Sequence, residues 1–269
     1  AFRLAEELSC PVMVCMDGFI LTHAYDRVDV PTQEQVDAFL PAFEPRQILD
    51  PREPVSIGAM VGPEAFTEVR YLAHHNQLRA LELIPRLAAE FKNEFGRESG
   101  GLLRTYRTDD AETIVVALGS VNGTVQEAVD KMREQGVKVG SVSLCSFRPF
   151  PLAAVRSALQ DAKRVVVLEK CFAVGLGGIV SDGVRKALSG IVLKGYTVVA
   201  GLGGRAITRA SLIKLLESAG RDELEAVTFL DLNREIVMHE LQRERKARRT
   251  GPTAEAILKS LGTVASSVG

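Results

Sequence analysis

Residues 110 to 232 repeat one pattern, a short apolar run followed by an amphipathic stretch. The apolar runs are rich in β-branched residues and do not alternate with polar ones, which is typical of strands buried on both faces. Alternating strands and helices of this length predict an α/β fold with a mostly parallel sheet and right-handed crossovers. The expected strands are 112–119, 137–144, 164–169, 196–202 and 226–232, and the expected helices are 124–136, 151–162, 179–190 and 208–220.

Residues 1 to 109 are less regular. The run 11–16 is apolar and is expected to form a buried strand. Six prolines stand between positions 31 and 63, which disfavours regular structure and suits an extended arm lying on another surface. Residues 66–96 show helical periodicity, as one long helix or two that break near Pro85. We therefore expect a first domain at 1–109 and a second domain at 110–269.

The composition excludes several classes of partner. The 33 basic and 34 acidic residues give a formal net charge of −1, which offers no general attraction for nucleic acid or an anionic membrane. No apolar run approaches the roughly 20 residues that span a bilayer. The first ten residues resemble the end of an amphipathic helix and lack the features of a signal peptide. This start is expected to continue a longer chain.

The four cysteines, Cys10, Cys15, Cys145 and Cys171, form no C-x-x-C motif. Cys15 and Cys145 lie in apolar, strand-like runs, where a free thiol behaves as a small hydrophobe. All four are expected to be structural thiols in a reducing cytoplasm. An iron–sulfur cluster calls for four clustered cysteines, so none is expected in this chain, and no metal site is expected either.

The stretch "GLGGRAIT" follows a predicted strand and precedes a predicted helix, at the sheet edge where open α/β folds bind ligands. Its glycines permit close backbone approach, and an arginine fork suits a carboxylate or phosphate. Neither a dinucleotide fingerprint nor a P-loop is present. Either an anion or cofactor lies here, or the stretch is a tight turn whose arginine pairs with protein. The candidates are Gly201, Gly203, Gly204, Arg205 and, as helix N-cap, Thr208. "VGLGG" (174–178) leaves the same choice, and two such turns on one sheet edge suggest a flat glycine surface that meets a partner.

The stretch "DGFILTH" (17–23) also follows an apolar run. Asp17 and His23 could form a site pair with Gly18 between them, because loops after strands often carry function. The alternative has Asp17 capping the turn at Gly18 and His23 making an ordinary hydrogen bond. No nucleophile, metal-ligand set or paired-carboxylate motif accompanies them. A complete active site is therefore not expected within this chain.

The C-terminal stretch 234–251 begins amphipathic and ends basic. Such a charge run forms either a solvated helix face or a docking site for an acidic partner. The basic residues are Arg243, Arg245, Lys246, Arg248 and Arg249.

Five stretches together resemble the alpha subunits of the pyruvate:ferredoxin oxidoreductases, a branch of the 2-oxoacid:ferredoxin oxidoreductases. They are "DGFILTH", the linker "GRESGGLLRTYRTDDAE", "GSVNGT", "SFRPFP" and "GLGGRAIT", in that order. The family often has aspartate where this chain has Ala206 and serine where it has Thr22. The resemblance implies that 1–109 is the remainder of a thiamine-diphosphate-binding, pyrimidine-type domain and that 110–269 is a transketolase C-terminal-like α/β domain.

The resemblance further implies oxidative decarboxylation of pyruvate with coenzyme A, giving acetyl-CoA, carbon dioxide and reduced ferredoxin, or the reverse reaction. Thiamine diphosphate and Mg2+ would be shared with a beta subunit, and gamma and ferredoxin-like delta subunits, or fused equivalents, would complete the cytoplasmic assembly. Iron–sulfur clusters and CoA would bind elsewhere in the complex. The catalytic residues are expected upstream of residue 1, so none is assigned in this chain.

Two other classes of function remain open from the residues. One is another thiamine enzyme, such as a transketolase or a 2-oxoacid dehydrogenase subunit, because the fold would be shared. The other is a non-enzymatic module that binds an anion or nucleotide at "GLGGRAIT".

Overall fold

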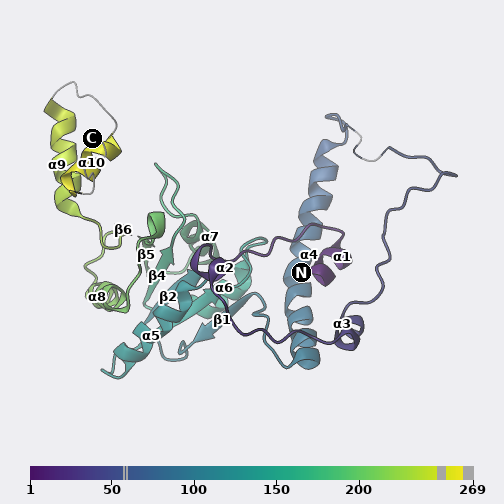
Figure 1. Ribbon diagram of the computed structural model, residues 1–269, viewed down its shortest axis with the longest axis horizontal. Helices are drawn as coiled ribbons and strands as arrows, with labels where there is room; N and C mark the ends of the chain where they lie inside the picture. Colours follow the sequence, from purple (N-terminus) through teal and green to yellow (C-terminus); the bar gives the residue numbers. More distant parts are fainter. Residues whose placement is uncertain (57, 59, 247–252, 263–269) are drawn as a thin grey trace. The chain divides into compact units, whose positions relative to one another are not determined.

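The computed structural model describes residues 1–56, 58, 60–246 and 253–262. The chain divides into two compact units, Ala1–Thr228 and Phe229–Gly269. The first unit holds the sheet and both segments that carry the candidate site. Figure 1 shows the elements of each unit along the chain.

The sheet has six strands in the order β1-β3-β2-β4-β5-β6. Strands β2, β3, β4 and β5 run parallel, and β1 at one edge is antiparallel to β3. The predicted α/β fold with a mostly parallel sheet is therefore confirmed. The strands are β1 (Leu103–Tyr106), β2 (Thr113–Leu118), β3 (Val139–Leu144), β4 (Arg164–Glu169), β5 (Lys194–Val199) and β6 (Val227–Phe229).

Helices cover both faces of this sheet in two pairs, α5 with α8 and α6 with α7. Their bounds are α5 (Val121–Arg133), α6 (Leu152–Leu159), α7 (Val180–Ala187) and α8 (Arg209–Gly220). All four lie where helical spacing predicts them. The last strand is shorter than its apolar run, because 230–232 turn away before α9.

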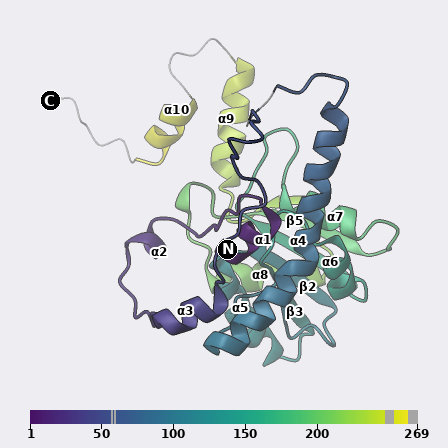
Figure 2. The same cartoon turned by 90° about the vertical axis from the view of Figure 1, so that its right-hand side faces the viewer.

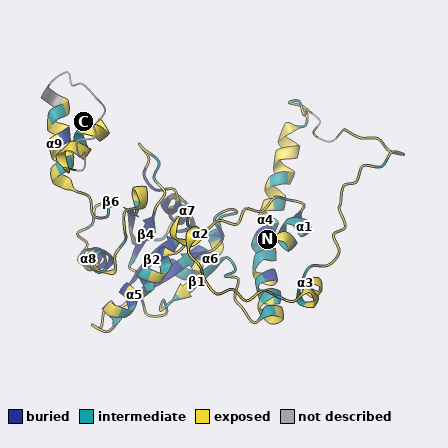
Figure 3. Cartoon of the chain, viewed as in Figure 1, coloured by how far each residue is buried: buried dark blue, intermediate teal, exposed yellow. Residues whose placement is uncertain are grey.

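The core lies between the strands and these helices, and Figure 3 shows the buried residues concentrated there. On the α6–α7 side, Val116, Val142 and Val167 pack with Val155 and Leu159. The alternate strand residues, such as Val115 and Val166, are equally buried and point to the opposite face. Each such side chain contributes roughly 1.5–3 kcal/mol by burial, which explains why these strands are apolar without alternation.

The segment before the sheet carries four helices, α1 (Phe2–Leu8), α2 (Ile20–His23), α3 (Gln33–Phe39) and α4 (Phe66–Phe95). Helix α4 is a single helix and contains Pro85. Helices α1 and α3 pack on it, and Figure 2 shows α1 lying beside α4. Arg3 joins these helices because it contacts the Glu90 carboxylate at 2.7 Å and donates to the Phe39 carbonyl at 3.1 Å.

The expectation of a buried strand at 11–16 is wrong. These residues are exposed and form no strand. A strand must pair with a neighbour, and the six strands of the described residues pair among themselves. All four cysteines are free thiols, and Cys15, Cys145 and Cys171 are exposed whereas Cys10 is partly buried.

The second unit contains α9 (Arg234–Lys246) and α10 (Thr253–Ser260). In α9, Arg243 pairs with the buried Glu240 at 2.8 Å. Arg248 and Arg249 of the basic stretch lie outside the described residues. No helix within the described ranges has the length and apolar character needed to cross a membrane.

Asp222 follows α8 and contacts the first residues of β4 and β5. These contacts predict how the stability of the fold depends on pH. Its carboxylate contacts Arg164 Nε at 2.6 Å and Lys194 Nζ at 2.7 Å. These two cations hold the pKa of the Asp222 carboxyl far below its usual value of 3.8. A carboxyl whose pKa is lower in the folded state than in the unfolded state stabilises the fold at pH values above its unfolded-state pKa. This contribution is lost as the pH falls from the unfolded-state pKa to the folded-state pKa.

We therefore expect Asp222→Asn to lower the stability of the chain at neutral pH. The difference from the original chain should shrink as the pH falls below about 4. Urea unfolding at several pH values measures it. Asp161→Asn, at an exposed position, is the control. A difference that stays constant across this pH range would contradict the assigned role.

Candidate functional site

The strand order places a switch point between β2 and β4. From β2 the chain proceeds to β3 on one side, whereas from β4 it proceeds to β5 on the other. The loops that leave the two strands therefore diverge at their carboxyl ends. In open parallel sheets the crevice at such a point is the usual place for a ligand.

Asp17 occupies this crevice. Its carboxylate accepts a hydrogen bond from the Ser120 backbone N–H at 2.7 Å and another from the Ser120 hydroxyl. Lys170 Nζ, directly after β4, lies 3.2 Å from Asp17 Oδ1. The hydrogen bonds from Ser120, assisted by Lys170, hold the pKa of the Asp17 carboxyl below its usual value. The crevice thus holds an ionised carboxylate that belongs to the chain itself.

Gly119 is what allows this approach. Its φ is +76°, and an added Cβ would lie 2.8 Å from Asp17 Oδ2. A side chain here would meet both backbone strain and a steric clash with the carboxylate. The turn between β2 and α5 is therefore shaped around Asp17.

Gly18 and His23 follow Asp17 on an exposed stretch. His23 Nδ1 lies 2.8 Å from the Phe19 carbonyl and 3.0 Å from Thr22 Oγ1. Asp17 and His23 thus use separate partners, Asp17 on the sheet edge and His23 within its own helical turn. The suggestion that Asp17 caps the turn at Gly18 is replaced by its contact with Ser120, 103 residues away.

The loop after β4 forms an exposed apolar tip that backbone hydrogen bonds close. Ala173 and Gly177 exchange two backbone hydrogen bonds of 2.8 Å, which close a tight turn. Gly175 and Gly177 adopt φ of +85° and +113°, which only glycine adopts readily. Val174 and Leu176 project from this turn and are 90% and 67% exposed.

The loop after β5 is a second glycine turn. Gly201, Gly203 and Gly204 all have positive φ, between +65° and +82°, and Leu202 in this turn is 43% exposed. Thr208 accepts a hydrogen bond from the Ser211 N–H at 3.1 Å, which confirms it as the N-cap of α8. Arg205 is exposed. We call residues 174–178 and 201–205 together the glycine rim.

A buried carboxylate anchors the base of the first loop. Glu169 is 4% exposed and ends β4. Its Oε2 accepts the N–H groups of Ile179 and Val180 at 2.8 and 2.7 Å. Its Oε1 accepts the N–H and hydroxyl of Ser181 at 3.1 and 2.8 Å. Glu169 therefore caps the N-terminus of α7, where the free N–H groups favour a negative charge.

Position 178 has room only for glycine beside the Glu169 carboxylate. This can be tested by comparing an alanine substitution at Gly178 with one at Gly195. An added Cβ at Gly178 would overlap the Glu169 carboxylate and lie 2.6 Å from Ser181 Oγ. We expect Gly178→Ala to lower the free energy of unfolding by about 2 kcal/mol, as overpacking does. Gly195→Ala in β5 meets open space and should change it by less than about 0.5 kcal/mol. Equal effects in urea unfolding would contradict this assignment.

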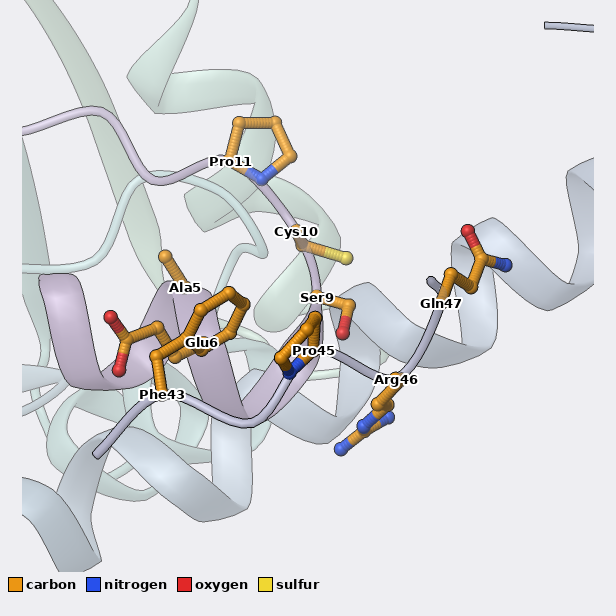
Figure 4. A pocket seen from close by; sticks show the side chains of 9 residues that line it. All are labelled: Ala5, Glu6, Ser9, Cys10, Pro11, Phe43, Pro45, Arg46 and Gln47. Atoms are coloured by element: carbon orange, nitrogen blue, oxygen red, sulfur yellow. The ribbon is translucent and has the colours of Figure 1, made fainter. Parts of the chain in front are cut away.

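A shallow hollow of about 390 Å³ lies beside the end of α1. Figure 4 shows its lining, in which Glu6, Cys10 and Arg46 accompany mainly apolar and small side chains. Within the described part of the chain, no three His, Cys, Asp or Glu side chains gather to hold a metal ion.

Three residues of the site were not singled out from the sequence, namely Ser120, Lys170 and Glu169. Each stands at or just after the end of a predicted parallel strand. Because the carboxyl ends of parallel strands share one edge of the sheet, polar residues at these positions can be recognised in the sequence as candidate site residues. The shared partner of Ser120 and Lys170 could not be predicted, because Asp17 lies more than 100 residues away from both in sequence.

Two family models match the chain. Residues 1–87 match "Pyruvate flavodoxin/ferredoxin oxidoreductase, thiamine diP-bdg", the thiamine-diphosphate-binding model. Residues 111–212 match "Pyruvate:ferredoxin oxidoreductase core domain II". The chain belongs to the pyruvate:ferredoxin oxidoreductase family. The two matches follow one another in the order that the sequence resemblance implies.

Curated members of this family are similar along most of the chain. Pyruvate synthase subunit PorA of Methanothermobacter thermautotrophicus is 40% identical over 87% of this chain and 61% of its own length. PorA of Methanosarcina barkeri is 39% identical over 88% and 61%. Ketoisovalerate oxidoreductase subunit VorA of Pyrococcus horikoshii is 34% identical over 90% and 61%. The chain thus spans about three fifths of the length of these relatives.

Proposed function

We propose that this chain is part of the alpha subunit of a 2-oxoacid:ferredoxin oxidoreductase that acts on pyruvate. The reaction would be oxidative decarboxylation of pyruvate with coenzyme A, giving acetyl-CoA and carbon dioxide with reduction of ferredoxin, or its reverse. The observation that carries the proposal is the pair of consecutive family matches over 1–87 and 111–212. The pyruvate synthase subunits at 39–40% identity favour pyruvate over a branched 2-oxo acid.

In this proposal the chain supplies scaffold. Residues 1–109 belong to the thiamine-diphosphate-binding domain and 110–269 form the second domain. Thiamine diphosphate supplies the carbanion chemistry when it binds with Mg2+ against a beta subunit. The iron–sulfur clusters that pass electrons to ferredoxin lie in other subunits of the complex, which also contains gamma and ferredoxin-like delta subunits or their fused equivalents. Asp17, Gly18 and His23 are the candidates of this chain for lying near the cofactor.

The glycine rim is proposed as a contact for another polypeptide. Two observations support this role. Its tip holds Val174 and Leu176 in a turn closed by backbone hydrogen bonds, so their exposure is built into the loop. Its second turn adds Leu202 and three glycines whose backbone can be approached closely. Rigid exposed apolar side chains are typical of interface anchors.

The test is purification of the native assembly through an affinity tag on this chain in its host. We expect reduction of methyl viologen that depends on pyruvate and CoA and that is lost when thiamine diphosphate is removed. The isolated 269-residue chain should have no such activity. Assays with 2-oxoisovalerate and 2-oxoglutarate test the substrate. The absence of any 2-oxo acid-dependent reduction in the purified assembly would contradict the proposal.

The same preparation separates the alternatives. Transfer to a lipoyl carrier, without viologen reduction, would indicate a 2-oxoacid dehydrogenase type of enzyme. Micromolar binding of a nucleotide, CoA or phosphate to the isolated chain in calorimetry, abolished by Arg205→Ala, would instead indicate a binding module at 201–208.

A further inference from the structure

We propose that the Asp17 carboxylate is a latch that fixes the 17–23 segment in the switch-point crevice, with the Gly119–Ser120 turn and Lys170 as its receptor. The latch concerns how two distant segments are held together, so it does not depend on which 2-oxo acid the assembly uses. It assigns Asp17 a positioning role. It also gives the crevice an occupant from the chain itself.

The first support is the burial pattern of residues 11–30. From residue 11 to residue 30 every residue is exposed except Asp17. Several of these exposed residues are large and apolar, such as Met13, Phe19 and Tyr25. The segment is therefore held mainly by polar contacts. Asp17 attaches it at the sheet edge, and Arg97 Nη1 donates to the Asp29 carbonyl near its other end at 3.2 Å.

The second support is the donor set that meets the carboxylate. Ser120 offers both its backbone N–H and its hydroxyl, and Lys170 adds a full positive charge from the neighbouring strand. The Ser120 hydroxyl makes no capping bond to α5, whose first turn follows directly. Donors from two strands thus converge on one acceptor. Hydrogen bonds to a charged acceptor are stronger than those between neutral groups.

The third support is the fit between receptor and occupant. The Asp17 carboxylate can lie this close to the backbone of Gly119 only because glycine has no Cβ. The receptor combines a backbone N–H, a hydroxyl and an ammonium, and all of them donate or attract negative charge. It therefore fits a small carboxylate. An amide at position 17 would lose the attraction of Lys170 and one acceptor oxygen.

The test is amide hydrogen exchange of the full 269-residue chain. Ser120 N–H is the probe because its recorded hydrogen-bond acceptor is Asp17. We expect Asp17→Ala to speed exchange at Ser120 by about tenfold or more, as loss of a charged hydrogen bond implies. Asp17→Asn should give a smaller increase. Asp26→Ala, which removes an exposed carboxylate of residues 11–30, should leave exchange at Ser120 unchanged.

A rescue experiment separates a carboxylate receptor from a general loss of stability. In Asp17→Ala, sodium formate should slow exchange at Ser120 again, whereas sodium chloride at the same ionic strength should not. Lys170→Met tests the receptor independently, should Asp17→Ala not fold, and should also speed exchange at Ser120. Lys214→Met on α8 is its control, at an exposed position.

Two results would overturn the latch. One is unchanged exchange at Ser120 in both Asp17→Ala and Lys170→Met. The other is a uniform increase across all strands of the sheet that formate does not reverse, because that pattern would make Asp17 a general stabiliser of the fold.

Discussion

Replacement of Glu169 by alanine is expected to lower the free energy of unfolding by about 3 kcal/mol, because buried donors then lose their acceptor. Glu169 ends β4 and receives four hydrogen bonds from Ile179, Val180 and Ser181. All three residues belong to the start of α7 or directly precede it. The substitution therefore leaves the N-terminus of that helix without its cap, and it frees the base of the glycine rim.

Urea unfolding followed by circular dichroism measures this effect. Glu169→Gln keeps an acceptor oxygen and the side-chain volume, so it should cost less than the alanine variant. Glu217→Ala on the exposed side of α8 should change stability by no more than about 0.5 kcal/mol. Similar losses for Glu169→Ala and Glu217→Ala would show that the carboxylate does not anchor the loop.

Leu176→Asp is expected to weaken assembly with partner subunits by at least about 30-fold in Kd, or about 2 kcal/mol. Leu176 is exposed at the tip of a turn fixed by Ala173 and Gly177. A charge placed there would be buried without a partner when another polypeptide covers the rim. The fold of the chain itself should be little affected, because Leu176 is 67% exposed.

Analytical ultracentrifugation or affinity capture of the assembly measures this loss. Val192→Asp is the matched control, since Val192 is fully exposed and precedes β5, at the amino ends of the strands. If Leu176→Asp assembles as well as Val192→Asp does, the rim is not an interface.

Much of the sheet region, residues 110–232, was predictable because its signals are local. The runs that became β2 and β4 are β-branched and apolar, and the helices between them repeat apolar residues at helical spacing. Burial on both faces of a parallel sheet imposes this pattern over six to thirteen residues. Thr208 was recognised as an N-cap for the same reason, since capping acts within one turn.

The errors and omissions arise where structure depends on distant partners. The apolar run 11–16 has the composition of a strand, but its sequence does not show whether a neighbouring strand is available to pair with it. The contact of Asp17 with Ser120 spans 103 positions. Glu169 looks like an ordinary polar residue at a strand end, and only the return of the chain to α7 gives it four donors.

We propose that this chain is a scaffold whose glycine rim is covered by other polypeptide. Hydroxyl-radical footprinting tests this by comparing side-chain oxidation in the isolated chain and in the native assembly. We predict that oxidation of Val174, Leu176 and Leu202, all exposed in the chain alone, falls strongly on assembly, whereas Val192 stays reactive. Equal oxidation of the three rim residues in both states would contradict the claim.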